Sequence, residues 1–307
     1  MLKYLVALDE FRHFSRAAEH CHVSQPTLSS QIRKLEGLLG TILVERHPGR
    51  IMLTPTGEKV VARARVILQE TENIRTITSR ARDPNSGTVR VGIFPTLGPY
   101  LLPHVIPALR QAYPRLKLRL VEEKTATIIS KLGDGKLDAG LLALPLAEDW
   151  LHRRRLFEEP FMLLAPAHHP LAKKDAIRMS DLADEELLLL EDGHCLRDQA
   201  LEVCQLAGAH EEVDFHATSL ETLRYMVAAN AGITLMPVLA TRPPAATAEN
   251  LTARPFEEPA PRRSIAMVWR KTSVMAEFLE ELARVFANID PQLLSSTAAD
   301  NKRADSA

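Results

Sequence analysis

The chain has 307 residues, of which 46% are hydrophobic and 25% charged, a composition typical of globular proteins. This length predicts two or three domains. No apolar run approaches the roughly 18 residues that a membrane-spanning helix needs, and the first residues do not resemble a signal peptide. Three cysteines are too few for a secreted disulfide scaffold. We therefore expect a cytoplasmic protein that does not enter a membrane.

The net charge of −1 conceals an uneven distribution. Residues 1–82 carry 13 Lys and Arg against 8 Asp and Glu, whereas residues 83–307 carry 25 against 31. A basic segment joined to an acidic one is typical of a nucleic-acid-binding module fused to a second domain. Charge alone leaves chance as an alternative, so the residue pattern has to decide.

Three short helices are expected in the first 40 residues. Apolar residues at helical spacing predict the first from about Tyr4 to Phe11, and Ser15 can cap a second. Ser24 is a plausible N-cap of the third, because its hydroxyl can reach the Thr27 amide. The third helix is expected to bury an apolar face made of Leu28, Ile32, Leu35 and Leu39.

Two short helices joined by a tight turn, the second with small polar residues and an arginine on its outer face, predict a helix-turn-helix. Small side chains let such a helix enter the major groove of DNA. Residues 43–54 then alternate like a hairpin with Arg46 and Arg50 near its tip, which predicts a wing for phosphate or minor-groove contact. The alternative is a generic three-helix bundle with a solvated polar face.

Residues 56–81 form one long helical stretch with a narrow apolar stripe. Such a helix usually packs on a partner helix, so we expect it to mediate dimerisation, with an ordinary core helix as the alternative. The sequence at 83–87 breaks the pattern and predicts a hinge.

The remainder alternates between strand-like and helix-like segments, which predicts a mostly parallel sheet with helices on both faces. Strands are expected over 89–94, 116–121, 138–144, 161–165, 187–190, 213–216, 233–236 and 265–270, and helices over 101–113, 125–132, 219–229 and 274–286. Residues 290–307 are expected to be a disordered tail.

The N-terminal motifs resemble those of the LysR-type transcriptional regulators. The similarity lies in residues 14–19, 23–29, 31–36, 39–40 and 53–57. One departure is that the first helix begins almost at Met1, whereas family members usually have several residues before it; two alternatives are open, a start assigned too late and a weaker first contact with the DNA backbone. The family's DNA-contacting positions fall on Gln25, Pro26, Ser29, Ser30, Arg33 and Arg50.

The resemblance also implies an α/β domain organisation. It comprises a winged helix-turn-helix DNA-binding domain at 1–57, a linker helix at 58–82 and, at 88–289, an effector domain of two lobes like a periplasmic binding protein. Homodimers or homotetramers, promoter DNA and RNA polymerase are the implied partners.

A second set of motifs resembles the hydrogen-peroxide-sensing branch of this family. It comprises residues 191–200 together with Cys204, and residues 95–103, 217–224 and 261–263. The resemblance implies that Cys195 is the peroxide-reactive thiol and Cys204 the resolving thiol. It further implies that peroxide is held near Cys195 by His194, Thr96 and Thr125, with Asp198 and Arg263 as supporting neighbours. No cofactor is implied, and His168 and His169 lack the companions of a metal site.

The sequence around the two cysteines fits these roles. Cys195 follows Asp192-Gly193 near the expected start of a helix, where free amides and the helix dipole stabilise a thiolate, and His194 or Arg197 could lower its pKa or orient a peroxide. Cys204 lies along the apolar face of the same helix, and this position by itself predicts a buried core residue. In a helix the two residues would lie about 13 Å apart along the axis and on opposite sides. Since a disulfide needs Cα atoms within about 7 Å, pairing them requires the helix to unwind at least in part.

Two alternatives remain at this point. A regulator of the same fold could respond to a small-molecule inducer between its lobes, and the cysteines would then be incidental. A thiol peroxidase would share the reactive and resolving cysteines, but it would leave residues 1–65 without a role.

Overall fold

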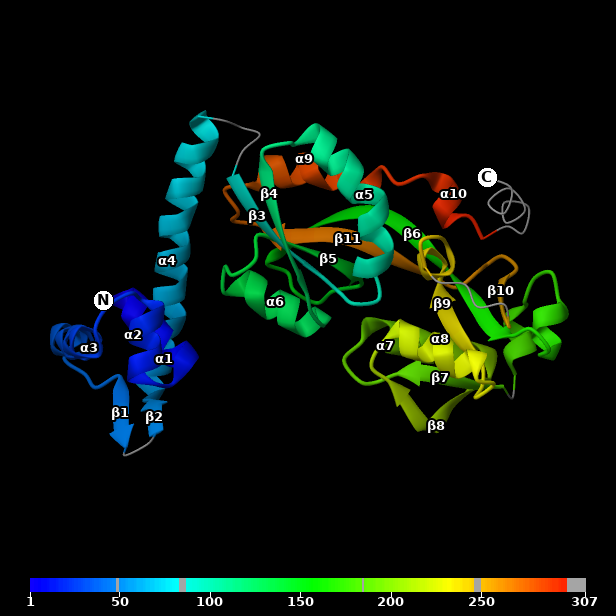
Figure 1. Ribbon diagram of the computed structural model, residues 1–307, viewed down its shortest axis with the longest axis horizontal. Helices are drawn as coiled ribbons and strands as arrows, with labels where there is room; N and C mark the ends of the chain where they lie inside the picture. The colour runs from blue at the N-terminus through cyan, green and yellow to red at the C-terminus, as the bar shows by residue number, and fades with distance from the viewer. Residues whose placement is uncertain (48–49, 83–86, 184, 246–249, 297–307) are drawn as a thin grey trace. The chain divides into compact units, whose positions relative to one another are not determined.

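The computed structural model describes residues 1–47, 50–82, 87–183, 185–245 and 250–296, which form two compact units (Figure 1). The first unit comprises Met1–Gly87 together with Gly133–Lys136, and the second comprises Thr88–Leu132 and the described residues from Leu137 onward. None of the helices within these ranges is long and apolar enough to cross a membrane.

The first unit is a winged helix-turn-helix followed by a long helix. Its elements are α1 (Leu2–Phe11), α2 (Phe14–His20), α3 (Gln25–Leu39), the antiparallel strands β1 (Val44–His47) and β2 (Arg50–Leu53), and α4 (Pro55–Arg82). The Ser24 hydroxyl accepts a hydrogen bond from the Thr27 amide at 3.3 Å, as expected for the cap of α3. Leu5, Leu8, Leu28 and Ile32 are fully buried in the core of this unit, and Cys21 is buried beside them.

Two local expectations for this unit were wrong. His13, rather than Ser15, caps α2, because His13 is extended and its Nδ1 accepts a hydrogen bond from the Ser15 amide at 3.2 Å. Leu39 is 49% exposed rather than buried, since it is the last residue of α3 and the chain turns away at Gly40, whose φ of 65° ends the helix.

The apolar stripe of α4 is buried near the start of the helix and exposed further along. Val61 and Ala64, near its start, are buried. Ile67 and Ile74, further along the expected apolar stripe, are 53% and 62% exposed. Ile67 and Ile74 are therefore apolar side chains that nothing within the described part of this single chain covers.

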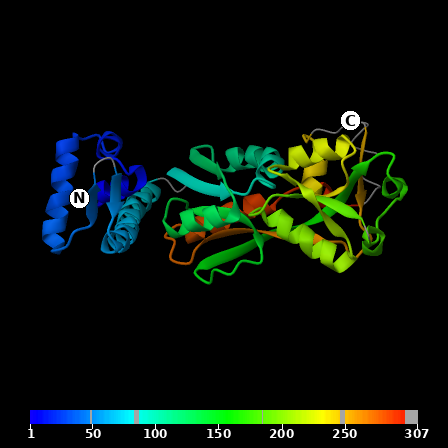
Figure 2. The same cartoon turned by 90° about the horizontal axis from the view of Figure 1, so that it is seen from below.

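The second unit consists of two α/β lobes joined by long strands. The first lobe contains β3 (Gly87–Ile93), α5 (Gly98–Ala112), β4 (Leu116–Glu122), α6 (Thr125–Gly133), β5 (Ala139–Leu144) and α9 (Ala276–Ala287). The second contains β7 (Glu186–Leu190), α7 (Cys195–Ala207), β8 (His210–Ala217), α8 (Leu220–Ala228), β9 (Thr234–Pro237) and β10 (Leu251–Pro255). Strands β6 (Leu151–Pro166) and β11 (Arg262–Arg270) connect the lobes, which lie side by side in both views (Figures 1 and 2).

The large sheet has the order β10-β6-β11-β5-β3-β4, with β9 also paired to β6. Strands β3 and β5 are parallel, as are β7 and β8 in the second lobe. The expectation of a mostly parallel sheet was nevertheless wrong. Strand β6 pairs antiparallel with β9, β10 and β11, and β11 pairs antiparallel with β5, because these long connecting strands run against their neighbours.

Helices cover both faces of the first lobe's sheet, with α5 and α9 on one face and α6 on the other (Figure 1). Tyr113, at the end of α5, packs edge-on against Phe278 of α9 with ring centroids 5.3 Å apart. Ile128 of α6 lies so close to β3 and β5 that a Cβ on Gly92 or Gly140 would come within 3.0 Å of it. Glycine at these two positions therefore allows the start of α6 to be held firmly against the sheet.

The expectation of a disordered tail from residue 290 was wrong at its beginning. Residues Pro291–Leu294 form α10, whose leucines pack against the core, and the Arg242 guanidinium donates a hydrogen bond to the Ser295 carbonyl at 2.6 Å. Residues 297–307 lie outside the described residues.

Candidate functional site

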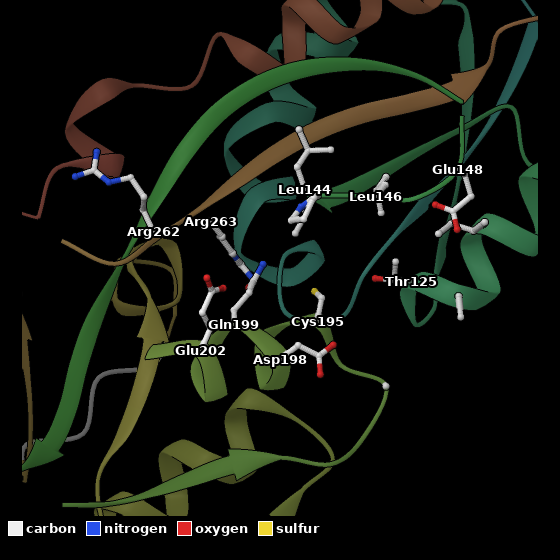
Figure 3. Close-up of a pocket in the computed structure, with 15 residues that line it drawn as sticks. Thr125, Leu144, Leu146, Glu148, Cys195, Asp198, Gln199, Glu202, Arg262 and Arg263 are labelled. Atoms are coloured by element: carbon white, nitrogen blue, oxygen red, sulfur yellow. The ribbon is translucent and has the colours of Figure 1, made fainter. Parts of the chain in front are cut away.

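Cys195 lies at the N-terminus of α7 and lines a cavity of about 680 Å³ between the two lobes (Figure 3). His194 is the N-cap of this helix, and its side chain makes no capping hydrogen bond. Gly193, just before it, has a φ of 86°, which a residue with a side chain would adopt only with strain. The sulfur of Cys195 lies between the side chains of Arg263 and Thr125 (Figure 3). Cys195 as a whole is only partly buried, and it is one of the residues that line this cavity.

Thr125, the first residue of α6, faces Cys195 across this cavity. Its hydroxyl favours the thiolate form of Cys195, although within the described residues the hydroxyl oxygen has no partner that meets ordinary hydrogen-bond geometry. A buried hydroxyl without a partner is costly. Thr125 is therefore available to a small polar molecule beside the sulfur.

Arg263 is fully buried and held on three sides. It forms an ion pair with Glu159, with Nη2 2.7 Å from Oε2, and its guanidinium stacks over Phe94 with 5.1 Å to the ring centroid. It also donates to the hydroxyl of Thr96 at 3.0 Å and to the Thr96 carbonyl at 2.9 Å. Thr96 thus holds Arg263, while Arg263, Thr125, Asp198 and Cys195 line the cavity.

Burial raises the pKa of the Cys195 thiol above its ordinary value. The positive charge of Arg263 and the Thr125 hydroxyl act in the opposite direction, and the negative charge of Asp198 adds to the increase. The expected lowering of the Cys195 pKa at the helix N-terminus is therefore outweighed by desolvation. The Arg197 guanidinium is engaged elsewhere: it pairs with Glu211 and with Asp192, the latter at 2.8 Å.

His194 is buried, and its pKa is lowered by burial and by the positive charge of Lys124. Its Nε2 lies 3.8 Å from a Glu191 carboxylate oxygen, which favours the charged form only weakly against these effects. The His194 imidazole is therefore neutral at pH 7. His194 neighbours Cys195 in sequence but does not line the cavity with it.

Cys204 lies on the same helix as Cys195 but faces the hydrophobic core of the second lobe. It is buried there with Ala200, Val203 and Ala207, as expected from the apolar face of α7. Both cysteines are free thiols. Because α7 is continuous from Cys195 to Ala207, they are separated by about 13 Å along the helix axis.

The first unit presents the expected DNA-contacting residues at the start of α3. Gln25, Pro26, Ser30 and Arg33 are exposed, and Ser29 is partly exposed. The Arg33 guanidinium donates to the Ser29 hydroxyl at 3.4 Å. Arg50 is the first residue of β2, but its side chain lies outside the described part of the structure.

Sequence reasoning missed several residues of the site. Glu159, the buried partner of Arg263, lies 104 positions away in the chain, so no local pattern connects the two. Gln199 and Glu202 line the cavity from α7; their helical spacing from Cys195, at four and seven residues, could have shown this. Lys124 contacts the loop before Cys195, and its position next to Thr125 was the available signal. Among the described residues, no group of three His, Cys, Asp or Glu is placed to hold a metal ion.

Comparison with known families matches two long segments of the chain. The family described as bacterial regulatory helix-turn-helix protein, lysR family, matches residues 1–58, and the LysR substrate binding domain matches residues 82–288. The chain belongs to the LysR family. This family consists of transcriptional regulators rather than enzymes, so a thiol peroxidase is no longer a candidate.

Within the LysR family the chain is OxyR-like. It is 48% identical over 282 residues to the DNA-binding transcriptional dual regulator OxyR of Escherichia coli K12, covering 92% of each chain. A full-length OxyR variant from Pseudomonas aeruginosa superposes with a TM-score of 0.78 at 39% identity, covering 94% of each chain. A crystal structure of the reduced form of OxyR matches with a TM-score of 0.61 at 45% identity, covering 66% of this chain and 95% of that one.

Proposed function

We propose that this LysR-family regulator detects hydrogen peroxide through Cys195 and transmits the signal through a disulfide with Cys204. The Cys195 thiolate attacks one peroxide oxygen; the S–O bond forms, the O–O bond breaks, and the released hydroxide takes up a proton to leave as water. The sulfur is oxidised to a sulfenic acid and the peroxide is reduced. The unpartnered hydroxyl of Thr125 beside the sulfur is the observation that carries this step.

The surrounding residues support this step in different ways. The fixed positive charge of Arg263 stabilises the thiolate and opposes the effect of burial. Thr96 holds Arg263 in place through its hydroxyl and its carbonyl. Asp198 opposes ionisation of Cys195 and offers a carboxylate to the cavity, and His194 occupies the N-cap position of the helix that carries the thiol, without a side-chain capping bond.

The second step joins the two cysteines. The Cys204 thiolate attacks the sulfenic sulfur of Cys195; the S–S bond forms, the S–O bond breaks, and the oxygen leaves as water after protonation. Because α7 holds the residues about 13 Å apart along its axis, at least part of the helix must unwind first. Cys204 must also leave the core of the second lobe, so oxidation changes the surface of the effector domain.

This rearrangement would act on DNA through the assembly. We expect α4 to join two chains through its exposed apolar stripe, and the effector domains to form homodimers or homotetramers whose pairing differs between the reduced and oxidised states. The helix-turn-helix residues Gln25, Pro26, Ser29, Ser30 and Arg33 and the wing residue Arg50 would contact promoter DNA. A changed spacing of the DNA-binding units would then recruit RNA polymerase and activate transcription.

The remaining alternative is an inducer-responsive regulator in which the cysteines are incidental. The two candidates are separated by mass mapping of Cys195 and Cys204 across a peroxide titration, with the promoter footprint followed in parallel. We expect a disulfide in the parent chain, a sulfenic acid at Cys195 in Cys204→Ser, and no response in Cys195→Ser. An equal peroxide-driven change of footprint in the parent chain and in Cys195→Ser would refute the proposal.

A further inference from the structure

Lys124 joins the two lobes next to the reactive thiol. Its amine lies 2.6 Å from a carboxylate oxygen of Glu191 and donates a second hydrogen bond to the Asp192 carbonyl at 3.0 Å. Its aliphatic chain packs over Gly193, where a Cβ would stand 3.3 Å from the Lys124 Cδ. One side chain from the first lobe thus contacts three successive residues of the loop that leads into Cys195.

Backbone hydrogen bonds hold the residues on both sides of this contact, Lys124 and Glu191. The Lys124 carbonyl accepts the first hydrogen bonds of α6, from the amides of Thr127 and Ile128 at 3.0 and 3.1 Å. On the other side, the Glu191 amide donates to the Ala217 carbonyl of β8 at 2.8 Å. Lys124 therefore links the start of α6 to the loop that follows β7, through an ion pair whose side chains are about two-fifths exposed, 39% for Lys124 and 40% for Glu191.

This contact matters because Lys124 is adjacent in sequence to a residue that faces the reactive thiol. The next residue is Thr125, whose hydroxyl faces the Cys195 sulfur, and Cys195 follows Gly193 by only two residues. The thiol and the hydroxyl belong to different lobes, so their separation depends on how the lobes are held together at this point. We propose that Lys124 is a positioning residue for the peroxide reaction, clamping the Glu191–Gly193 loop so that Cys195 meets Thr125.

This inference rests on the proposed function, and its test separates the two. In the full chain with Cys204→Ser, sulfenic acid formation at Cys195 is timed by quenched-flow mass spectrometry. Lys124→Met should lower the second-order rate constant with peroxide at least about threefold, because small misplacements of reacting groups slow a reaction strongly. Alkylation of Cys195 by iodoacetamide, which needs the thiolate but not Thr125, should stay unchanged or become faster.

Lys131, on α6 itself, provides a matched control for Lys124, which immediately precedes this helix. It forms a similar ion pair with Glu123 at 2.5 Å, with comparable exposure, but does not reach the second lobe. Lys131→Met should therefore leave both rate constants unchanged. Equal peroxide rates in Lys124→Met and the parent, or an equal loss in Lys131→Met, would overturn the inference. A parallel fall of the peroxide and alkylation rates would also overturn it, since that result indicates a change in the thiolate rather than in its position.

A charge exchange tests the ion pair itself and does not depend on how well one variant folds. Lys124→Glu and Glu191→Lys should each slow the peroxide reaction, and the two together should restore most of the parent rate. A double variant as slow as the single ones would contradict the clamp. If Cys195 of the Cys204→Ser parent does not form a sulfenic acid at all, the proposed function fails instead.

Discussion

Arg263 and Glu159 form an ion pair in which both side chains are completely buried. Glu159 lies on β6 and Arg263 on β11, and the Glu159 carboxylate also accepts a hydrogen bond from the Leu239 amide at 3.1 Å. Through the bonds of Arg263 to Thr96, the pair fixes the turn after β3 as well. The cation that favours the Cys195 thiolate is thus part of the core that connects the two lobes.

The first prediction concerns this pair. Glu159→Gln keeps the side-chain volume but leaves the guanidinium buried without a countercharge, so it should lower the free energy of unfolding by about 3–5 kcal/mol. Urea unfolding followed by tryptophan fluorescence measures the change. Glu258→Gln is the matched control, because Glu258 pairs with the neighbouring Arg262 at the surface and should have little effect. Equal urea midpoints for Glu159→Gln and Glu258→Gln would show that the buried Arg263–Glu159 pair contributes no more to stability than the surface pair.

The second prediction is the pH dependence of the peroxide reaction. Because burial raises the Cys195 pKa above its ordinary value of about 8.5, the thiolate is a minor species at pH 7. The rate constant of the Cys204→Ser chain with peroxide should therefore keep rising between pH 7 and 9, without a plateau. Arg263→Gln removes a charge that favours the thiolate, and should lower the rate throughout this range. A plateau below pH 8 in the unsubstituted site would indicate a lowered pKa instead.

The third prediction follows from the helix between the cysteines. Cys195 and Cys204 cannot meet within an intact α7, so disulfide formation should unwind part of this helix. The far-ultraviolet circular dichroism spectrum should then lose helical signal equivalent to up to about ten residues. Cys204→Ser treated with the same peroxide should stop at the sulfenic acid and keep its spectrum. An unchanged spectrum of the parent, with the disulfide verified by mass, would mean that α7 survives oxidation.

Local signals in the sequence were sufficient for many elements but not for all. The third helix and its Ser24 cap could be predicted because the stabilising contact spans only three residues. Strand β6 was expected over 161–165 alone, since its first half, around Arg153–Arg155, is charged and partly exposed and resembles a loop. Strand β10 was missed for a similar reason: four of its five residues are only partly buried. Both strands are held by pairing with distant strands rather than by their own pattern.

In the candidate site, too, some features could be predicted from the sequence and others could not. Motif resemblance brought Cys195, Thr125, Asp198 and Arg263 into consideration, and the structure places all four on one cavity. The pKa of Cys195 could not be predicted, because the sequence shows the helix start and the nearby charges but not the depth of burial. Arg197 illustrates the point: it adjoins Cys195 in sequence, but it pairs with Glu211 and Asp192.

The last prediction concerns assembly through α4. Ile67 and Ile74 lie seven residues apart and therefore on one side of the helix, and both are more than half exposed. If this stripe joins two chains, Ile74→Glu buries an unpaired carboxylate in the contact and should weaken association at least about tenfold. Sedimentation velocity of the full chain should then show a lower average mass. Val66→Glu is the control, since Val66 is 49% exposed but one position off the stripe. If both variants sediment like the parent, chains associate through another surface; if both dissociate, the contact is wider than this stripe.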